Sequence, residues 1–270
     1  MNYNFLIALL FILTACQSAN NTTDSNTGNN NAVAPTKVLQ YEIVKIHPHD
    51  TSSYTQGLEW NNNELIEGTG NYGKSILHKL NPNMKSIGKK VQLPSAEFGE
   101  GITQFKDKIY QLTWKEKKVY VYDAKTLEKI KELYWPYEGW GLTHNDTSLI
   151  VSTGGSNIYF VNPENFNIQK TLGVYNQFGY VSDINELEYF EGKIAANIYL
   201  TNDIILIDPV SGQVKEIMNF DQLLAQANVK EDPTSIDPGY VLNGIAYHPI
   251  NKTLFITGKC WPIMAEIKIK

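Results

Sequence analysis

Phe98-Gly99-Glu100-Gly101-Ile102 contains the pattern that decides the fold of this chain: a polar or aromatic residue, then glycine in most copies, then an aliphatic residue. The pattern occurs five times, as Gln56-Gly57-Leu58, Glu100-Gly101-Ile102, Trp140-Gly141-Leu142, Asn185-Glu186-Leu187 and Asn243-Gly244-Ile245. The aliphatic residues are 44, 40, 45 and 58 positions apart. A period of roughly 40–45 residues is typical of repeat architectures in which each unit is one small antiparallel sheet.

Each repeat continues with the elements of a four-stranded blade. Hairpins are predicted over 108–123, 148–161 and 193–207, and an Asx turn after each one leads to an outer strand. Five such units predict an all-β fold, a five-bladed β-propeller with four-stranded antiparallel blades. We expect the strand at 38–46 to pair with the C-terminal strands and complete the last blade, because ring closure removes an exposed sheet edge.

The propeller domain is predicted to span 38–270 and to contain one insertion. The last interval exceeds the others, and the excess falls at about 220–240. Residues 221–228 have the composition of a helix, with Asp221 as its N-cap, before two prolines break it. We interpret this segment as an insertion between blades that forms a flap over one face.

The N-terminal segment predicts export rather than structure. Residues 1–15 have the short apolar run of a signal peptide, which is too short to span a bilayer. The run ends in Leu13-Thr14-Ala15-Cys16, which resembles a bacterial lipobox with Cys16 as the lipidated residue; an ordinary signal peptide with an incidental cysteine is the alternative. Residues 16–37 are mostly small and polar, so we expect a flexible tether. The predicted location is the cell envelope, at the periplasmic face of the outer membrane in a Gram-negative host.

Composition narrows the choice of partners. The chain has 270 residues and a net charge of −5, which argues against a nucleic acid or an anionic membrane surface as the partner. We therefore expect membrane contact through the lipid anchor only, and a monomer. The two cysteines are Cys16 and Cys260; if Cys16 carries lipid, the chain forms no internal disulfide and Cys260 is a buried thiol.

The first residue of each repeated segment is the candidate functional position, because equivalent positions in a closed ring converge on one axis. These residues are Gln56, Glu100, Trp140, Asn185 and Asn243. Glu100 lies between two glycines, and burial in a narrow funnel would raise its pKa toward neutrality, as a general acid–base requires. The structural alternative is a carboxylate that accepts hydrogen bonds from inner-strand amides.

Aromatic, amide and amine side chains complete the candidate site. Trp114 and Trp140 would wall the funnel, unless they serve only blade packing. The amides of Gln56, Asn185 and Asn243 would orient a polar substrate or stabilise an oxyanion, unless they only join blades. Lys259 ends a second strand at the place that Trp114 occupies in its own blade, so it faces either the funnel or solvent.

Other site types find no support in the sequence. The five histidines are scattered, and only His47 and His49 are close together, in a loop that contains proline. We therefore predict no zinc site. The sequence also contains no nucleophile elbow, phosphate-binding loop or dinucleotide fingerprint.

A series of motifs follows one order along the chain: Tyr54-Thr55-Gln56-Gly57-Leu58, Phe98-Gly99-Glu100-Gly101-Ile102-Thr103, Gln111-Leu112-Thr113-Trp114, Glu138-Gly139-Trp140-Gly141-Leu142, Asn185-Glu186-Leu187-Glu188-Tyr189, Leu242-Asn243-Gly244-Ile245-Ala246, Gly258-Lys259 and Trp261-Pro262. Over about residues 38–270, this series resembles the glutamine cyclotransferase family, the plant-type glutaminyl-peptide cyclotransferases and their bacterial relatives. The resemblance implies a five-bladed propeller that converts the N-terminal glutamine of peptides or proteins to pyroglutamate with release of ammonia.

The resemblance also implies roles for individual residues. Glu100 would transfer protons, and Asn185 and Lys259, with Gln56, would hold the substrate and the oxyanion. The remaining substrate-binding residues would be Tyr54, Trp114, Trp140, Asn243 and Tyr199. Tyr199 aligns where plant sequences typically carry tryptophan, which implies a more polar pocket. The family implies no zinc and no required cofactor; the sequence leaves a structural calcium open.

Two other functions remain open at this point. The first is a catalytically inactive propeller lipoprotein that binds envelope proteins or peptides. The second is a metal-dependent propeller similar to lactonases, which would require several acids around calcium. Glu100 is the only acid at the first position of the five segments, which counts against the second.

Overall fold

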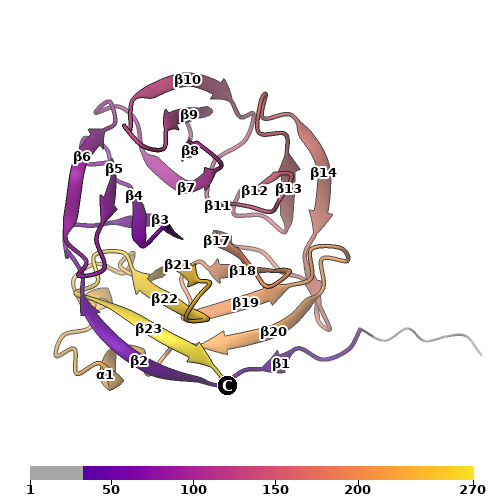
Figure 1. Ribbon diagram of the computed structural model, residues 1–270. Helices are drawn as coiled ribbons and strands as arrows, with labels where there is room; N and C mark the ends of the chain where they lie inside the picture. The colour runs from indigo at the N-terminus through magenta and orange to yellow at the C-terminus, as the bar shows by residue number, and fades with distance from the viewer. Residues whose placement is uncertain (1–32) are drawn as a thin grey trace, which may run out of the picture. The chain divides into compact units, whose positions relative to one another are not determined.

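Five four-stranded antiparallel sheets surround a central axis in the computed structural model, which describes residues 33–270 (Figure 1). The predicted five-bladed propeller is therefore confirmed. The predicted signal peptide (1–15), the lipidation at Cys16 and most of the predicted tether lie outside the described residues. Among residues 33–270, no helix is long and apolar enough to cross a membrane.

The first three blades each follow the chain from the innermost strand outward. Blade 1 consists of β3 (Thr55–Asn61), β4 (Glu64–Thr69), β5 (Ile76–Leu80) and β6 (Ser86–Gln92). Blade 2 consists of β7 (Gly99–Phe105), β8 (Lys108–Thr113), β9 (Lys118–Asp123) and β10 (Lys129–Tyr134). Blade 3 consists of β11 (Leu142–His144), β12 (Leu149–Ser152), β13 (Asn157–Val161) and β14 (Ile168–Gly173).

The last two blades use strands from the N-terminal end of the described chain. Blade 4 consists of β17 (Ile184–Phe190), β18 (Lys193–Ile198), β19 (Asp203–Ile207) and β20 (Val214–Asn219), with the short β1 (Lys37–Val38) parallel to β20. Blade 5 consists of β21 (Leu242–His248), β22 (Thr253–Gly258), β23 (Ile263–Ile269) and, outermost, β2 (Tyr41–Pro48).

Ring closure occurs by the predicted pairing, with one difference. β2 pairs antiparallel with β23, so the N-terminal strand completes the last blade (Figure 1). Val38, which we expected in that strand, instead pairs with Ile217 of blade 4. Leu39 and Gln40 separate the two pairings and belong to no strand, because Lys37 and Val38 pair with the edge of blade 4 instead of blade 5.

The insertion is less helical than its composition predicts. Only Leu223–Gln226 forms a helix (α1), and a 3₁₀ turn follows at Pro233–Ser235. The prediction of Asp221 as N-cap is wrong: Gln222 is the N-cap residue and makes no capping bond. The Asp221 carboxylate instead accepts a hydrogen bond from the Asn202 side-chain amide at 3.0 Å.

Apolar side chains pack between blades rather than in one central core. Each of five clusters joins two neighbouring blades, and each contains an aliphatic residue of the repeated segment: Leu58, Ile102, Leu142, Leu187 and Ile245. The candidate residue lies two positions before each of these, at the start of the inner strand, where the pairing register of blades 1, 2, 4 and 5 is irregular. The same pattern that builds the blade interfaces therefore places the candidate site.

The inner strands approach one another closely where the repeat has glycine. A Cβ on Gly141 would lie 2.0 Å from the Asn185 carbonyl oxygen of the next blade. Glu186 replaces glycine in the fourth repeat, and its carboxylate accepts backbone N–H groups of Leu58 (3.2 Å) and Ile245 (2.9 Å). One carboxylate thus joins the inner strands of blades 1, 4 and 5.

Substitution of Gly141 by alanine tests this close packing. We expect Gly141→Ala to lower the free energy of unfolding by about 1–3 kcal/mol, because the added methyl group overlaps backbone that cannot move independently. Gly155→Ala is the control, since its nearest contact would be 3.9 Å away. Urea unfolding followed by tryptophan fluorescence measures both; equal stability of the two variants would contradict the expectation.

Candidate active site

A cavity of about 190 Å³ opens at the propeller axis. Eight of the nine predicted catalytic and substrate-binding residues line it, together with one that was not predicted, Phe98. The full lining is Tyr54, Gln56, Phe98, Glu100, Trp114, Trp140, Asn185, Tyr199 and Lys259. The repeat pattern and the topology together therefore locate the cavity.

Two places in the blade supply these side chains. The first is the start of the innermost strand, which positions Gln56, Glu100 and Asn185 on β3, β7 and β17. The second is the residue directly after the second strand, which is Trp114, Tyr199 or Lys259, after β8, β18 and β22. Both places lie at the same end of the ring, since neighbouring strands within a blade run antiparallel.

Glu100 is the only carboxylate among the residues that line the cavity. Its side chain is buried, and among the described residues no hydrogen bond stabilises its charge. Burial raises the pKa of Glu100 well above its ordinary value, the nearby Lys259 ammonium partly opposes the rise, and Glu116 and Glu138 add to it. A carboxyl group with a raised pKa that faces a cavity is suited to accept and return a proton.

Lys259 places a cation in the same cavity. It is 3% exposed, and its Nζ lies 4.9 Å from the ring centre of Tyr54 and 4.7 Å from that of Tyr199. Burial lowers the pKa of Lys259 to about 8, although the Glu100 carboxylate opposes this. Two aromatic faces thus hold a partly desolvated ammonium by cation–π contacts.

The indoles of Trp114 and Trp140 are held by one acceptor. Glu138 Oε2 accepts the indole N–H of Trp114 at 2.8 Å and that of Trp140 at 3.3 Å. Trp140 also meets Tyr199 edge to face, with ring centres 5.5 Å apart. The aromatic wall is therefore fixed before any ligand binds.

Asn243 does not line the cavity, although the sequence predicts that it contacts substrate. It is fully buried, and its amide donates hydrogen bonds to the Thr55 carbonyl at 2.9 Å and to Gln56 Oε1 at 3.2 Å. Its place is behind Gln56, whose side chain it orients.

The sequence matches the family described as Glutamine cyclotransferase over residues 8–269. This chain belongs to that family. Glutaminyl-peptide cyclotransferase of Arabidopsis thaliana is 31% identical over 236 residues, which are 87% of this chain and 72% of that protein. The crystal structure of Myxococcus xanthus glutaminyl cyclase has a TM-score of 0.78 to this chain at 29% identity, and the match covers 87% of this chain and 98% of that one.

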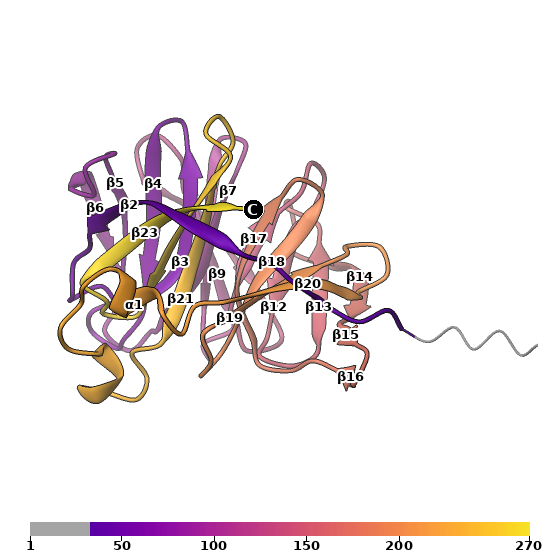
Figure 2. The same cartoon turned by 90° about the horizontal axis from the view of Figure 1, so that it is seen from below.

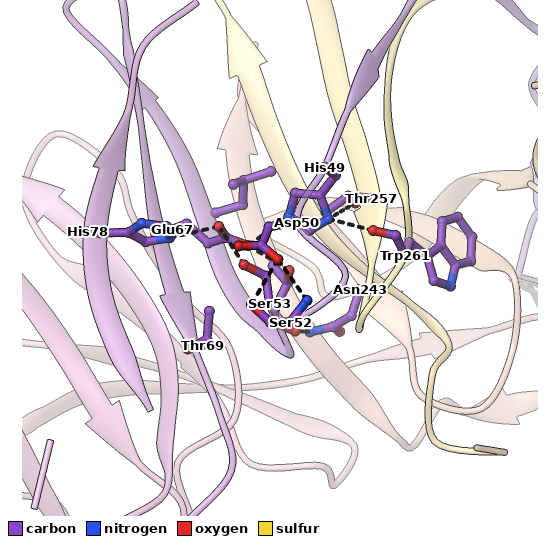
Figure 3. A network of polar contacts seen from close by, with 12 residues as sticks. His49, Asp50, Ser52, Ser53, Glu67, Thr69, His78, Asn243, Thr257 and Trp261 are labelled. Atoms are coloured by element: carbon purple, nitrogen blue, oxygen red, sulfur yellow. Dashed lines mark hydrogen bonds and ion pairs between the residues drawn. The ribbon is translucent and has the colours of Figure 1, made fainter. Parts of the chain in front are cut away.

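A buried ionic network fixes the loop that carries Lys259 in this cyclotransferase-family chain. The Glu67 carboxylate contacts His49 Nε2 at 3.0 Å and His78 Nε2 at 2.9 Å, and accepts the Thr55 hydroxyl at 2.7 Å (Figure 3). The other nitrogen of His49, Nδ1, lies 2.9 Å from the Trp261 carbonyl oxygen. The network therefore joins blade 1 to the loop after β22.

The protonation states in the network follow from its contacts. Burial alone would raise the pKa of Glu67, but His49 and His78 outweigh it and lower that pKa. Burial alone would lower the pKa of His49, but the Glu67 carboxylate outweighs it and raises that pKa. We infer a carboxylate paired with an imidazolium, which donates from both nitrogens.

Phe98, Glu138 and the ionic network of Glu67 were not predicted from the sequence. A usable signal exists for the first two, because each lies two residues before the central residue of its repeat, as Tyr54 does before Gln56. Period-2 alternation puts such residues on the same side of the chain. The network has no such signal, since its members come from non-equivalent positions. Among residues 33–270, no group of three or more His, Cys, Asp or Glu side chains is placed to hold a metal ion.

Proposed function

We propose that this chain is a glutaminyl-peptide cyclotransferase, which closes an N-terminal glutamine into pyroglutamate. The α-amine nitrogen attacks the side-chain amide carbon, a ring C–N bond forms, and the bond to the side-chain nitrogen breaks, releasing ammonia. The observation that carries the proposal is the buried Glu100 carboxyl facing the cavity beside the Lys259 ammonium, in a member of this family.

Each lining residue has a role in this mechanism. Glu100 accepts the proton that the amine loses and returns it to the departing nitrogen. The Asn185 amide and the Lys259 ammonium stabilise the negative oxygen that develops on the attacked carbon. The aromatic wall and Gln56 hold the substrate in position. Because the ring closes within one molecule, positioning supplies a large part of the acceleration.

Ammonia release tests the activity directly. We expect release from a short peptide with N-terminal glutamine and none from the same peptide after N-acetylation, which removes the nucleophile. A coupled glutamate dehydrogenase assay measures ammonia, and mass spectrometry detects a loss of about 17 Da from the peptide. If the folded protein releases no ammonia from the unmodified peptide, the inactive peptide-binding propeller becomes the better explanation.

We also propose that cyclisation by this chain needs no zinc or other cofactor. The support is that Glu100 supplies the acid–base group and Lys259 supplies positive charge, which are the two tasks a zinc-bound site performs. Incubation with a chelator, followed by removal of the chelator–metal complex, should leave the rate unchanged. A rate that falls and returns when zinc is added would contradict this.

Tyr199 is expected to support Lys259 rather than the chemistry itself. We predict that Tyr199→Ala lowers kcat/KM roughly 5- to 30-fold, since a desolvated cation–π contact contributes about 1–2 kcal/mol. Tyr199→Trp should keep most of the activity, because the indole offers Lys259 a larger aromatic face. The control is Tyr180→Ala, whose side chain is 79% exposed. If Tyr199→Ala keeps the wild-type kcat/KM, the contact between Tyr199 and Lys259 contributes nothing to activity.

We propose that the chain is exported and held at the cell envelope by lipid on Cys16, as an enzyme that works as a monomer. The support is the lipobox-like segment 13–16 and the polar segment that follows it. Metabolic labelling with an alkyne fatty acid should mark the wild type and not Cys16→Ser, which should also leave the membrane fraction. Equal labelling of the two proteins would contradict lipidation at this residue.

A further inference from the structure

A second and larger cavity lies beside the candidate active site. Its volume is about 670 Å³, and the insertion between blades 4 and 5 forms one of its walls. We call it the insertion groove. Its apolar lining residues include Val229, Pro233, Ile236 and Pro262, and the charged Lys230 and Glu231 also line it.

The insertion groove adjoins the active-site cavity at two places. Lys259 lines the cavity and the next residue, Cys260, lines the groove. Tyr54 lines the cavity and Tyr240 lines the groove, and their ring centres are 6.2 Å apart, edge to face. Two adjacent residues and one aromatic pair therefore separate the two spaces.

The groove and the cavity also open on the same end of the ring. The insertion connects the outer strand β20 to the inner strand β21, so it lies at the end where inner strands begin. Tyr54 and Trp140 precede their inner strands at that end. Figure 2 shows α1 and the loop after it projecting from this side, as the hairpin of β15 (Tyr175–Asn176) and β16 (Gly179–Tyr180) does.

The active-site cavity is small, about 190 Å³, and we expect it to take the N-terminal glutamine. The peptide chain that follows it must leave the cavity, and the groove offers an apolar surface directly beyond the Tyr54–Tyr240 pair.

We propose that the insertion groove binds the second and third residues of the substrate, and that it selects peptides with apolar side chains there. This rests on the proposed cyclotransferase function. Ile236 is 66% exposed at the groove, so an apolar side chain of the substrate removes exposed hydrophobic surface from water on both molecules. The same insertion that breaks the regular repeat period thus gives the chain its preference for peptides over single amino acids.

Comparison of substrates that differ only beyond the glutamine tests the proposal. We expect kcat/KM to be roughly tenfold higher for Gln-Leu-Leu-amide than for Gln-Ser-Ser-amide or glutamine amide, as for a side chain that enters an apolar pocket. In Ile236→Asp, kcat/KM for the leucine peptide should fall to about the value for glutamine amide, because a carboxylate then replaces the apolar side chain. Ile250→Asp is the matched control, since Ile250 is 87% exposed and does not line the groove.

The outcomes separate the two proposals. If glutamine amide and both peptides react at equal kcat/KM, the groove proposal is wrong and the cyclotransferase function stands. The same conclusion follows if Ile236→Asp keeps the wild-type preference. If no substrate reacts, the function fails and the groove proposal fails with it. Calorimetric binding of the product, pyroglutamyl-Leu-Leu-amide, to both variants gives a readout without turnover: only Ile236→Asp should weaken it.

Discussion

Glu100→Gln should lower kcat by roughly 10²- to 10⁴-fold, the range that general acid–base groups contribute. The substitution keeps the shape of the side chain and removes only its ability to accept and return a proton. We expect KM to change little, since the amide still fills the same volume. Steady-state ammonia release with a glutaminyl peptide measures both constants, and Glu128→Gln on the exposed surface is the control. A kcat within threefold of wild type would exclude Glu100 as the proton carrier.

The pH profile of kcat gives a second test of the same pair. Glu100 acts as a base only when ionised, and its pKa is raised, so activity should increase with pH through a value above the ordinary one of about 4.3. Lys259 is protonated below its pKa of about 8, so activity should decline above that pH. In Lys259→Met, the alkaline decline should disappear and the acid limb should move to higher pH, because the ammonium that opposes the rise in the Glu100 pKa is gone. An acid limb that stays in place would show that the two groups do not interact.

The fold was predictable from the sequence because a propeller repeats its local pattern. The aliphatic residue that packs between blades and the residue that faces the axis are two positions apart in each repeat, so one short motif predicts both. Topology then placed Lys259 by analogy with Trp114, since both follow a second strand. The repeat period predicts the place of a residue within its blade, and that place decides whether its side chain lines the cavity.

Features that occur once could not be found in this way. The hairpin of β15 and β16 lies between blades 3 and 4, and no other repeat has a counterpart. α1 spans a single turn, although the composition favours eight helical residues: Asn228 has a left-handed φ of 58°, and Asp221 is bonded to Asn202. Local propensity predicts where a helix is possible, while such tertiary contacts decide where it begins and ends.

The ionic network of Glu67 shows the same limit, because it belongs to the junction of the first and last blades. Its members come from β4, β5 and the connection between β2 and β3. Neither the spacing of His49 and His78 nor the repeat pattern indicates that one carboxylate joins them. Removal of one member of this network is nevertheless expected to be strongly destabilising, because an uncompensated charge would stay buried.

Glu67→Gln should lower the free energy of unfolding by about 3–5 kcal/mol, the range for breaking a buried ion pair by removing one partner. The carboxamide cannot neutralise His49, which is left as an unpaired buried cation or must lose its proton. Glu64→Gln is the matched control on the same strand: Glu64 pairs with Lys79 at 3.1 Å near the surface, so about 0–1 kcal/mol is expected. Urea unfolding measures all three proteins, and a Glu67→Gln loss no larger than that of the control would contradict the network's role.

The difference between wild type and Glu67→Gln should also depend on pH. The pKa of Glu67 is lowered in the folded state, so its contribution is present above about pH 4.3 and is lost as pH falls toward the folded value. The pKa of His49 is raised, so its contribution is complete below about pH 6.5 and is lost as pH rises through the folded value. The stability difference is therefore greatest between about pH 4.3 and 6.5. Because His49 Nδ1 also contacts the Trp261 carbonyl oxygen, two residues from Lys259, alkaline loss of this ion pair should loosen the loop that carries Lys259.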